Sequence, residues 1–401
     1  MAGSPPRPVV LSGLDRLRAG EGPSLRGVPV ALLCHPASVS SELEHAIDIL
    51  SGKVGADLVA LLGPEHGLDA AAQDMEPVDD GPAKIPSYSL YGDEFDSLRP
   101  KPAMFHGAEW LVCDLQDIGA RYYTYVWTIL LATEVALAAG LRVLLLDRPN
   151  PLGGLDDAVE GGAIEPGEES FVGLHNISVR HGLSAAELVT MALAERGVEG
   201  WDRVQVIECA GWRRRQLFAE TGLPWVLPSP NMPTLETAQV YPGQCLLEGT
   251  NLSEGRGLTR PFEIFGAPFI DGRALAGAIA AEDSPGLALR PCTFKPTFHK
   301  FGGQRCGGVQ LHVQRPAEVR SLRTSWALLR ACWRLSGGAM RWRTERYEFV
   351  DDRPAIDLLA GGPWLRAAIE AQTPVAELVA AHEGARQGFL ARRRPFLRYP
   401  E

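Results

Sequence analysis

Short apolar runs that end abruptly in polar, glycine or proline residues mark the first 150 residues of the chain. Four such runs cover residues 28–34, 58–62, 110–113 and 143–146. Each has the length of a buried strand. In a parallel α/β sheet, ligands bind beyond the carboxyl ends of the strands. We therefore expect the chemistry of this protein to lie along one rim of a sheet.

Segments with helical spacing separate these runs. Helices are expected over residues 40–50, 125–139 and 184–196, where a serine precedes the segment or a glycine follows it. A further strand is expected over residues 204–208. Strands that alternate with helices are typical of βαβ units. The pattern predicts an α/β fold with a mainly parallel sheet.

The second half of the chain predicts a smaller α/β lobe, with a strand over residues 308–313 and helices over 321–335 and 363–370. A proline-rich stretch at 224–234 is a candidate domain junction. We therefore expect one domain over residues 1–228 and a smaller one over 229–401 that closes a cleft. The arginine-rich stretch 391–394 is interpreted as a solvated terminal turn.

Composition narrows the class of protein. A chain of 401 residues exceeds what one core usually supports, and a net charge of −10 disfavours nucleic acid and anionic membranes as partners. The seven cysteines are scattered and never form Cys-x-x-Cys, which fits a reducing compartment. No amino-terminal signal peptide and no apolar run of membrane-spanning length is evident, so we expect a cytoplasmic location and no membrane.

The first candidate for chemistry is Glu65-His66, directly after the second apolar run. A buried carboxyl there could act as a general acid near neutral pH. The alternative is a loop carboxylate that caps a helix, with His66 bound to a backbone carbonyl. Glu65, His66, Asp69 and Asp74 could also form a metal site, but no His-x-x-x-His or Asp-x-Asp spacing supports one. We expect no metal.

A second cluster follows the third apolar run and contains Asp114, Asp117, Arg121 and Tyr123. Acids accept hydrogen bonds from hydroxyls, tyrosine faces pack on sugar C–H groups, and arginine binds carboxylates with two donors. The cluster therefore suits a polyhydroxyl ligand. The alternative is an internal Asp–Arg pair that orients the loop.

A third cluster, residues 248–257, contains Asn251, Glu254 and Arg256 between glycines. It predicts a polar pocket wall from the second lobe, or otherwise a tight surface turn. No phosphate-binding glycine loop and no Gly-x-Ser-x-Gly nucleophile motif is present, so we expect no nucleotide and no cofactor. Carboxyl groups are then the best acid and base candidates, as in glycosidases.

Ordered motifs now point to a family. They are Gly-Pro-Glu65-His-Gly, Ser-Leu-Tyr91-Gly, the stretches 114–125 and 147–151, Pro-Ser-Pro-Asn-Met-Pro-Thr234, Tyr-Pro-Gly243, the stretch 248–257, Pro-Phe-Glu263 and the stretch 352–359. With these motifs the chain resembles the exo-β-N-acetylmuramidases from about residue 27 to 399. The resemblance implies a Rossmann-like amino-terminal domain, a smaller carboxyl-terminal domain and an active site between them.

The resemblance also implies removal of N-acetylmuramic acid from the non-reducing end of peptidoglycan fragments, in cell-wall recycling or turnover. The family's proposed catalytic glutamate falls on Glu65. One departure is Asp69-Ala70, where family members commonly have Arg-Gly. If that arginine holds the lactyl carboxylate of the substrate, either the substrate preference differs here or Arg121 or Arg256 takes its place.

We therefore expect a glycosidase in which Glu65 protonates the departing oxygen and a second acid, Glu254 first and Asp114 second, completes the reaction. The expected substrate-binding residues are His66, Asp117, Arg121, Tyr123, Asn231, Asn251 and Arg256. A small saccharide or muropeptide is the expected partner. Retaining, inverting and acetamido-assisted mechanisms all stay open. The alternatives are a non-catalytic muropeptide-binding protein and a metal-assisted hydrolase that uses Glu65, His66 and Asp74.

Overall fold

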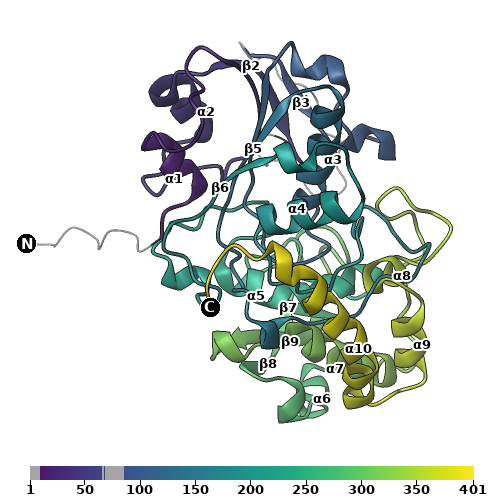
Figure 1. The fold of residues 1–401 in the computed structure, drawn as a ribbon. Helices are drawn as coiled ribbons and strands as arrows, with labels where there is room; N and C mark the ends of the chain where they lie inside the picture. Colours follow the sequence, from purple (N-terminus) through teal and green to yellow (C-terminus); the bar gives the residue numbers. More distant parts are fainter. Residues whose placement is uncertain (1–9, 66, 68–84) are drawn as a thin grey trace, which may run out of the picture.

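A six-stranded parallel sheet forms the centre of the first half of the chain. The computed structural model describes residues 10–65, 67 and 85–401. The strands are β1 (Pro29–Cys34), β2 (Asp57–Gly63), β3 (Ser87–Ser89), β4 (Trp110–Asp114), β5 (Arg142–Leu146) and β6 (Gln205–Ile207). Their order is β3-β2-β1-β4-β5-β6, and all neighbours run parallel (Figure 1). This is the Rossmann order, which reverses between β1 and β4. The predicted parallel α/β fold is confirmed.

The apolar runs form strands without alternating polar residues because both faces of the sheet are covered. In β1, Ala31 and Leu33 pack into one apolar cluster, whereas Val30 and Leu32 pack into another on the opposite face. Helices α3 (Tyr125–Ala138) and α4 (Ala185–Glu195) cover the first face. Helices α1 (Gly13–Arg18) and α2 (Ala46–Asp48) cover the second (Figure 1).

The helix expected over residues 40–50 begins six residues late. The Ser40 hydroxyl accepts hydrogen bonds from the backbone N–H groups of Glu42 and Glu44, both at 3.2 Å, and so holds a turn instead of capping a helix. The His45 ring accepts from the backbone N–H of Ile47 and caps α2 in its place. A π-helical segment, Ile49–Val54, then continues to β2.

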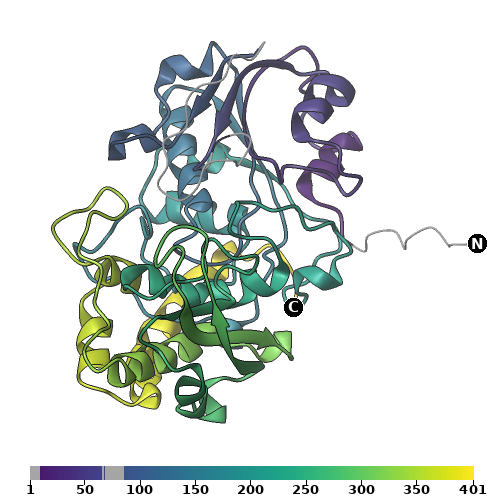
Figure 2. The same cartoon turned by 180° about the vertical axis from the view of Figure 1, so that it is seen from behind.

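The second half contains a smaller antiparallel sheet. Its strands are β7 (Ile264–Ala267), β8 (Leu287–Phe294) and β9 (Cys306–Val313), in the order β7-β9-β8. Figure 2 shows this sheet in green. Its helices are α5 (Leu235–Gln244), α6 (Gly272–Gly277), α7 (Ser321–Leu335), α8 (Ala355–Ala360), α9 (Trp364–Glu370) and α10 (Val375–Arg393). The predicted strand at 308–313 and the helices at 321–335 and 363–370 are confirmed within two residues. The predicted boundary at 228/229 stays a prediction.

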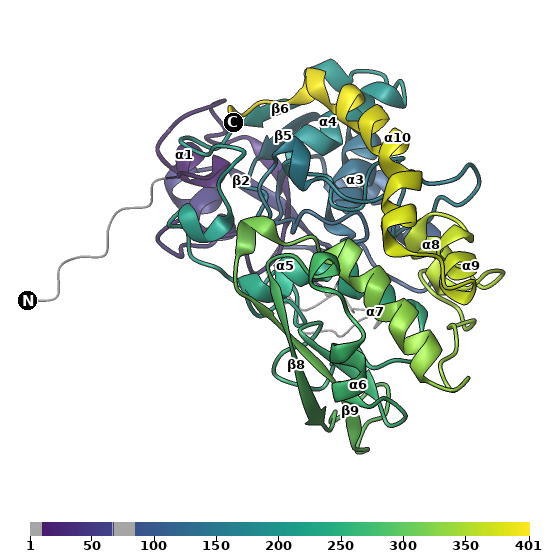
Figure 3. The ribbon, with the colours of Figure 1, turned by 90° about the horizontal axis from the view of Figure 1, so that it is seen from below.

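The long helix α10 crosses from the second half back to the first (Figure 3). Near its end, Arg393 is fully buried and donates hydrogen bonds to the carbonyls of Gly154, His181 and Gly182. Its guanidinium also pairs with Asp156 at 2.6 Å. The expectation of a solvated turn at 391–394 is therefore wrong, because the helix carries this arginine into the first half.

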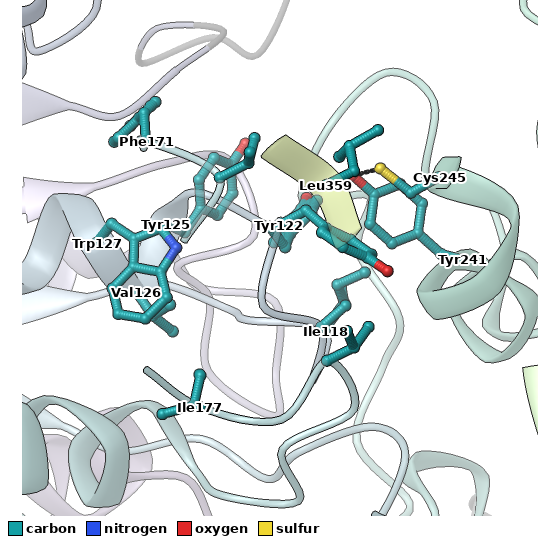
Figure 4. Packing of buried hydrophobic residues seen from close by; sticks show 14 of the residues in the cluster. Ile118, Tyr122, Tyr125, Val126, Trp127, Phe171, Ile177, Tyr241, Cys245 and Leu359 are labelled. Atoms are coloured by element: carbon teal, nitrogen blue, oxygen red, sulfur yellow. Dashed lines mark hydrogen bonds between the residues drawn. The ribbon is translucent and has the colours of Figure 1, made fainter. Parts of the chain in front are cut away.

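One apolar cluster spans both halves of the chain. Figure 4 shows Tyr122, which precedes α3, beside Tyr241 and Leu359 of the second half. Buried members of the same cluster extend from Ala31 in β1 to Leu390 in α10. The two halves therefore share a hydrophobic core. Among the described residues, no helix is long and apolar enough to cross a membrane.

Candidate active site

A pocket lies where the carboxyl ends of β2 and β4 meet the second half of the chain. Glu65 follows β2, and the loop from β4 to α3 supplies the tyrosines. Its lining residues are Glu65, Tyr122, Tyr123, Thr124, Tyr125, Val172, Ser229, Asn231, Met232, Tyr241, Glu248, Arg256, Phe262, Tyr347 and Glu348. This is the rim at which open parallel sheets bind ligands.

Glu65 is a buried carboxyl in the wall of this pocket. Only 7% of the surface of Glu65 is exposed to solvent. The Thr124 hydroxyl, directly before α3, donates a hydrogen bond to Glu65 Oε2 at 2.7 Å. The Tyr125 hydroxyl lies 3.4 Å from the Glu65 carbonyl oxygen and donates to the carbonyl of Pro228 at 2.6 Å. The strand end and the helix start together fix the carboxyl at the pocket.

Aromatic side chains from both halves form another wall. Tyr122 and Tyr123 from the β4–α3 loop lie against Tyr241 of α5, with ring centres 6.4 and 5.9 Å apart. Tyr241 in turn packs edge-on against Phe262 at 4.8 Å. Burial raises the pKa of Tyr123 well above its usual range, although Ser229 and Tyr125 lower it in part. The hydroxyl of Tyr123 therefore keeps its proton near neutral pH and can donate to a ligand.

Arg256 brings a positive charge to the pocket. Its guanidinium pairs with Glu248 at 2.7 Å and with Glu254 at 3.3 Å, and lies 5.3 Å from the ring centre of Phe262. Glu248 also accepts a hydrogen bond from the Tyr347 hydroxyl at 2.7 Å. Arg256 can therefore contact an anionic group of a ligand while two acids fix its position.

Glu254, the first expected second acid, does not line the pocket but lies behind Arg256. It is fully buried and forms ion pairs with His299 at 3.1 Å and Lys300 at 2.9 Å. Burial raises the pKa of Glu254, but Lys300, His299 and Arg256 together lower it by a larger amount. The pKa of Glu254 therefore lies well below its usual range. A carboxyl held in the ionised form by Lys300 and Arg256 suits an anchor for Arg256 better than proton transfer.

Asp114 and Asp117 also lie outside the pocket wall. Asp114, at the end of β4, forms a two-point ion pair with Arg148 at 2.6 and 2.8 Å. Asp117 accepts a hydrogen bond from the backbone N–H of Gly119 at 2.7 Å and lies 3.3 Å from the His181 ring. Asp114 thus forms an internal Asp–Arg pair, but with Arg148 from outside the cluster and not with Arg121.

Arg121 and Asn251 have structural partners away from the pocket. Arg121 is fully buried, donates to three backbone carbonyls, among them that of Leu359 in α8, and burial lowers its pKa to about 10. The Asn251 amide donates to the carbonyl of Ala339 at 3.0 Å and accepts from the backbone N–H of Arg341 at 2.8 Å. Both residues therefore fix segments of the second half in place.

His66, Asp69 and Asp74 lie outside the described residues, and so does the departure at Asp69-Ala70. Within the described ranges, no group of three or more His, Cys, Asp or Glu side chains could hold a metal ion. The expectation of no metal stays a prediction.

Of the expected residues, the structure brings Glu65, Tyr123, Asn231 and Arg256 to one pocket. Several lining residues were not expected from the sequence: Thr124, Ser229, Tyr241, Glu248, Tyr347 and Glu348. The first four lie inside the family motifs, so their position was a usable signal. Tyr347 and Glu348 carry no such local signal.

Comparison with known proteins gives matches over almost the whole chain. Two family models match, described as the amino-terminal part of the exo-β-N-acetylmuramidase NamZ over residues 30–236 and its carboxyl-terminal part over residues 239–399. The chain is 38% identical over 396 residues to the peptidoglycan β-N-acetylmuramidase NamZ of Bacillus subtilis, across 98% of this chain and 92% of that protein.

Two solved structures share the architecture. Both are DUF1343 family proteins from Bacteroides fragilis. One has a TM-score of 0.86 at 29% identity, and the match covers 98% of this chain and 100% of that structure's chain. The other has a TM-score of 0.75 at 26% identity and covers 98% and 99%. The likeness therefore includes both halves of the chain.

Proposed function

This chain belongs to the exo-β-N-acetylmuramidase NamZ family, and on that premise we propose how its pocket carries out the reaction. The protein is a glycosidase that releases N-acetylmuramic acid from peptidoglycan fragments, an activity consistent with cell-wall recycling. Cleavage requires a proton for the departing sugar oxygen and a nucleophile for the anomeric carbon.

Glu65 is the general acid in this proposal. The observation that carries it is a buried carboxyl in the pocket wall, oriented by the Thr124 hydroxyl at 2.7 Å. The carboxyl gives its proton to the glycosidic oxygen as the bond between that oxygen and the anomeric carbon breaks. A positioned acid of this kind contributes about 100- to 10,000-fold in rate.

Tyr123, Asn231 and Arg256 bind the sugar. The Tyr123 hydroxyl and the Asn231 amide line the pocket and can bond to hydroxyl and acetamido groups. Arg256 is the one arginine among the pocket's described lining residues, so it is assigned to the lactyl carboxylate. Its existing pairs with Glu248 and Glu254 keep the guanidinium aimed at the pocket.

Two substrates test the role of Glu65. One is a disaccharide with N-acetylmuramic acid at its non-reducing end, and the other is a 4-nitrophenyl β-N-acetylmuramide. The Glu65→Gln variant should lose at least about 100-fold in turnover of the disaccharide. The loss on the nitrophenyl substrate should be smaller, because nitrophenolate departs without a proton. Exposed Glu318 provides the matched control Glu318→Gln, which should behave as wild type.

Unchanged disaccharide turnover in Glu65→Gln would remove Glu65 from the mechanism. Wild-type protein that binds the disaccharide without cleaving it would favour the muropeptide-binding alternative instead. Activity that is lost on treatment with a chelator and restored by a divalent metal would favour the metal-assisted hydrolase.

We also propose a cytoplasmic location. All seven cysteines lie in the described part of the chain, six of them buried, and none forms a disulfide there. Thiols kept in this state are typical of a reducing compartment. Fractionation of cells followed by immunodetection would test the location, and recovery of the protein outside the cytoplasmic fraction would contradict it.

A further inference from the structure

A tight hairpin at residues 347–350 presents Glu348 to the pocket on strained backbone. The backbone N–H of Tyr347 donates to the carbonyl of Val350 at 2.8 Å, and the reverse bond measures 3.0 Å. The two central residues, Glu348 and Phe349, have φ angles of +46° and +71°. Turns of this kind favour Asn-Gly, because side chains with a Cβ are disfavoured at positive φ. Two such residues in succession therefore carry a conformational cost.

The first half of the chain holds this hairpin in place. The Phe349 ring packs between aromatic side chains of that half, at ring-centre distances of 5.5 Å to Tyr91, 6.1 Å to Phe95 and 6.2 Å to Phe171. Arg346 donates a hydrogen bond to the carbonyl of Asp93 at 2.9 Å. These contacts offset the cost of the strained turn and fix its position relative to the rim that carries Glu65.

The hairpin consequently holds the carboxyl of Glu348 in the wall of the pocket. The residue is 3% exposed, lines the same pocket as Glu65, and accepts a hydrogen bond from the Tyr91 hydroxyl at 3.3 Å. Strain of this type clusters at functional sites, where the surrounding structure over-determines it. A hairpin needed only for folding would be formed at lower cost with asparagine or glycine at these positions.

We propose that Glu348 is the second catalytic carboxylate of this enzyme, an assignment that rests on the proposed role of the pocket. The Glu348 carboxylate takes a proton from a water molecule as the water oxygen bonds to the anomeric carbon. The glycosidic bond breaks in the same step, and Glu65 delivers its proton to the departing oxygen. The other acids near the pocket have a different task, since Glu248 and Glu254 hold Arg256.

Four variants test this assignment. Glu348→Gln and Glu348→Ala should lose at least about 100-fold in turnover of both the disaccharide and the nitrophenyl substrate, because loss of the base does not depend on the leaving group. Exposed Glu345 stands three residues away in the chain, and Glu345→Gln should retain wild-type rates. Glu348→Asn keeps a residue that tolerates positive φ, so it should fold even if the alanine variant does not.

Azide separates a catalytic role from a structural one. Azide needs no base, so its nitrogen can bond to the anomeric carbon while the glycosidic bond breaks. Sodium azide should therefore raise the turnover of Glu348→Ala on the nitrophenyl substrate and give a 1-azido sugar of inverted configuration, identified by NMR. The same salt should leave the Glu345→Gln variant unchanged. Wild-type enzyme should release the α-anomer first.

Each remaining outcome overturns the assignment. Folded Glu348→Gln or Glu348→Asn that works within about tenfold of wild type would exclude a catalytic role. So would an inactive Glu348→Ala that azide does not rescue, or a wild-type product of retained configuration. Failure of the proposed function looks different, because then wild-type protein itself would not release N-acetylmuramic acid.

Discussion

Single buried acids in this molecule meet opposite electrostatic surroundings. Burial raises the pKa of Asp147 to about 6, and the hydroxyls of Ser184 and Tyr399 reverse only part of that change. The cations around Glu254 more than cancel its burial, as described above. The local sequence around Asp147 and Glu254 does not predict that their pKa values shift in opposite directions. Only the partners that folding assembles decide which of them keeps a proton.

Asp147 makes stability depend on pH. Its folded pKa lies above the unfolded value near 3.8, so the folded chain holds a proton that the unfolded chain releases between about pH 4 and 6. The free energy of unfolding therefore falls as the pH rises through this window. The contribution amounts to about 3 kcal/mol at 1.36 kcal/mol per pKa unit. Asp147→Asn should remove it.

Urea unfolding of the wild type and of Asp147→Asn from pH 4 to pH 7 measures this effect. The contributions of other titrating groups cancel in the difference between the two free energies of unfolding. The stability of Asp147→Asn relative to wild type should increase with pH across the window and then level off. A difference that stays constant with pH would contradict the assignment of this titration to Asp147.

Glu254→Gln should destabilise the fold and impair the pocket. The substitution leaves the positive charges of Arg256 and Lys300 without their shared carboxylate, and removing one member of a buried ion pair costs roughly 3–5 kcal/mol. Arg256 then loses one of its two fixed partners, so KM for the anionic substrate should rise more than kcat falls. Urea unfolding and steady-state kinetics measure the two effects. A stable variant with unchanged KM would show that Glu254 does not position Arg256.

Elements were predictable where local pattern and burial agree. Strands β1, β2, β4 and β5 matched their expected ranges closely, since strands covered on both faces are continuous apolar runs. The three-residue β3 was missed because Ser-Tyr-Ser is too short and too polar to give a pattern. The helix expected from residue 40 failed at its start because Ser40 bonds to a turn, and this choice depends on the surrounding chain.

The same limit applies to the site. Glu65, Tyr123 and Arg256 were found because each follows or lies within a recognisable motif. Arg148 neutralises Asp114 from 34 residues away, which no local pattern reveals. Glu348 reaches the pocket through a hairpin that aromatic rings of the first half hold in position, so its role depends on tertiary packing.

The attachment of helix α10 to the first half is expected to depend on Arg393. In Arg393→Ala, the carbonyl of His181 loses a buried donor and Asp156 loses its ion pair, whereas the carbonyls of Gly154 and Gly182 keep Arg214 as a donor. A buried polar group left without a partner costs about 1–3 kcal/mol. Hydrogen exchange in residues 375–393 should therefore accelerate, with a smaller change in β1 and β4. Equal exchange in both proteins would mean that apolar packing alone holds the helix.

At the scale of the whole molecule, the pocket and the core are both shared between the halves. Glu65, Tyr123 and Asn231 come from before the start of α5, whereas Glu248, Arg256 and Glu348 come from beyond it. The largest apolar cluster extends from β1 to α10. Neither half therefore contains the complete site or the whole of this largest cluster.

A shared core predicts cooperative unfolding. Intrinsic tryptophan fluorescence, far-ultraviolet circular dichroism and hydrolytic activity should all be lost at the same urea concentration, in a single transition. Coincident curves would reflect one folding unit. Two separated transitions, or activity lost well before secondary structure, would show that the halves unfold independently.

The shared core also bears on how such proteins are inherited. A gene rearrangement that transplanted either half into another protein would leave a broad apolar surface uncovered, and the transplanted piece would tend to aggregate. We therefore expect the two halves to be inherited as one genetic unit. New substrate preferences should then arise by point substitutions around the pocket and not by exchange of domains.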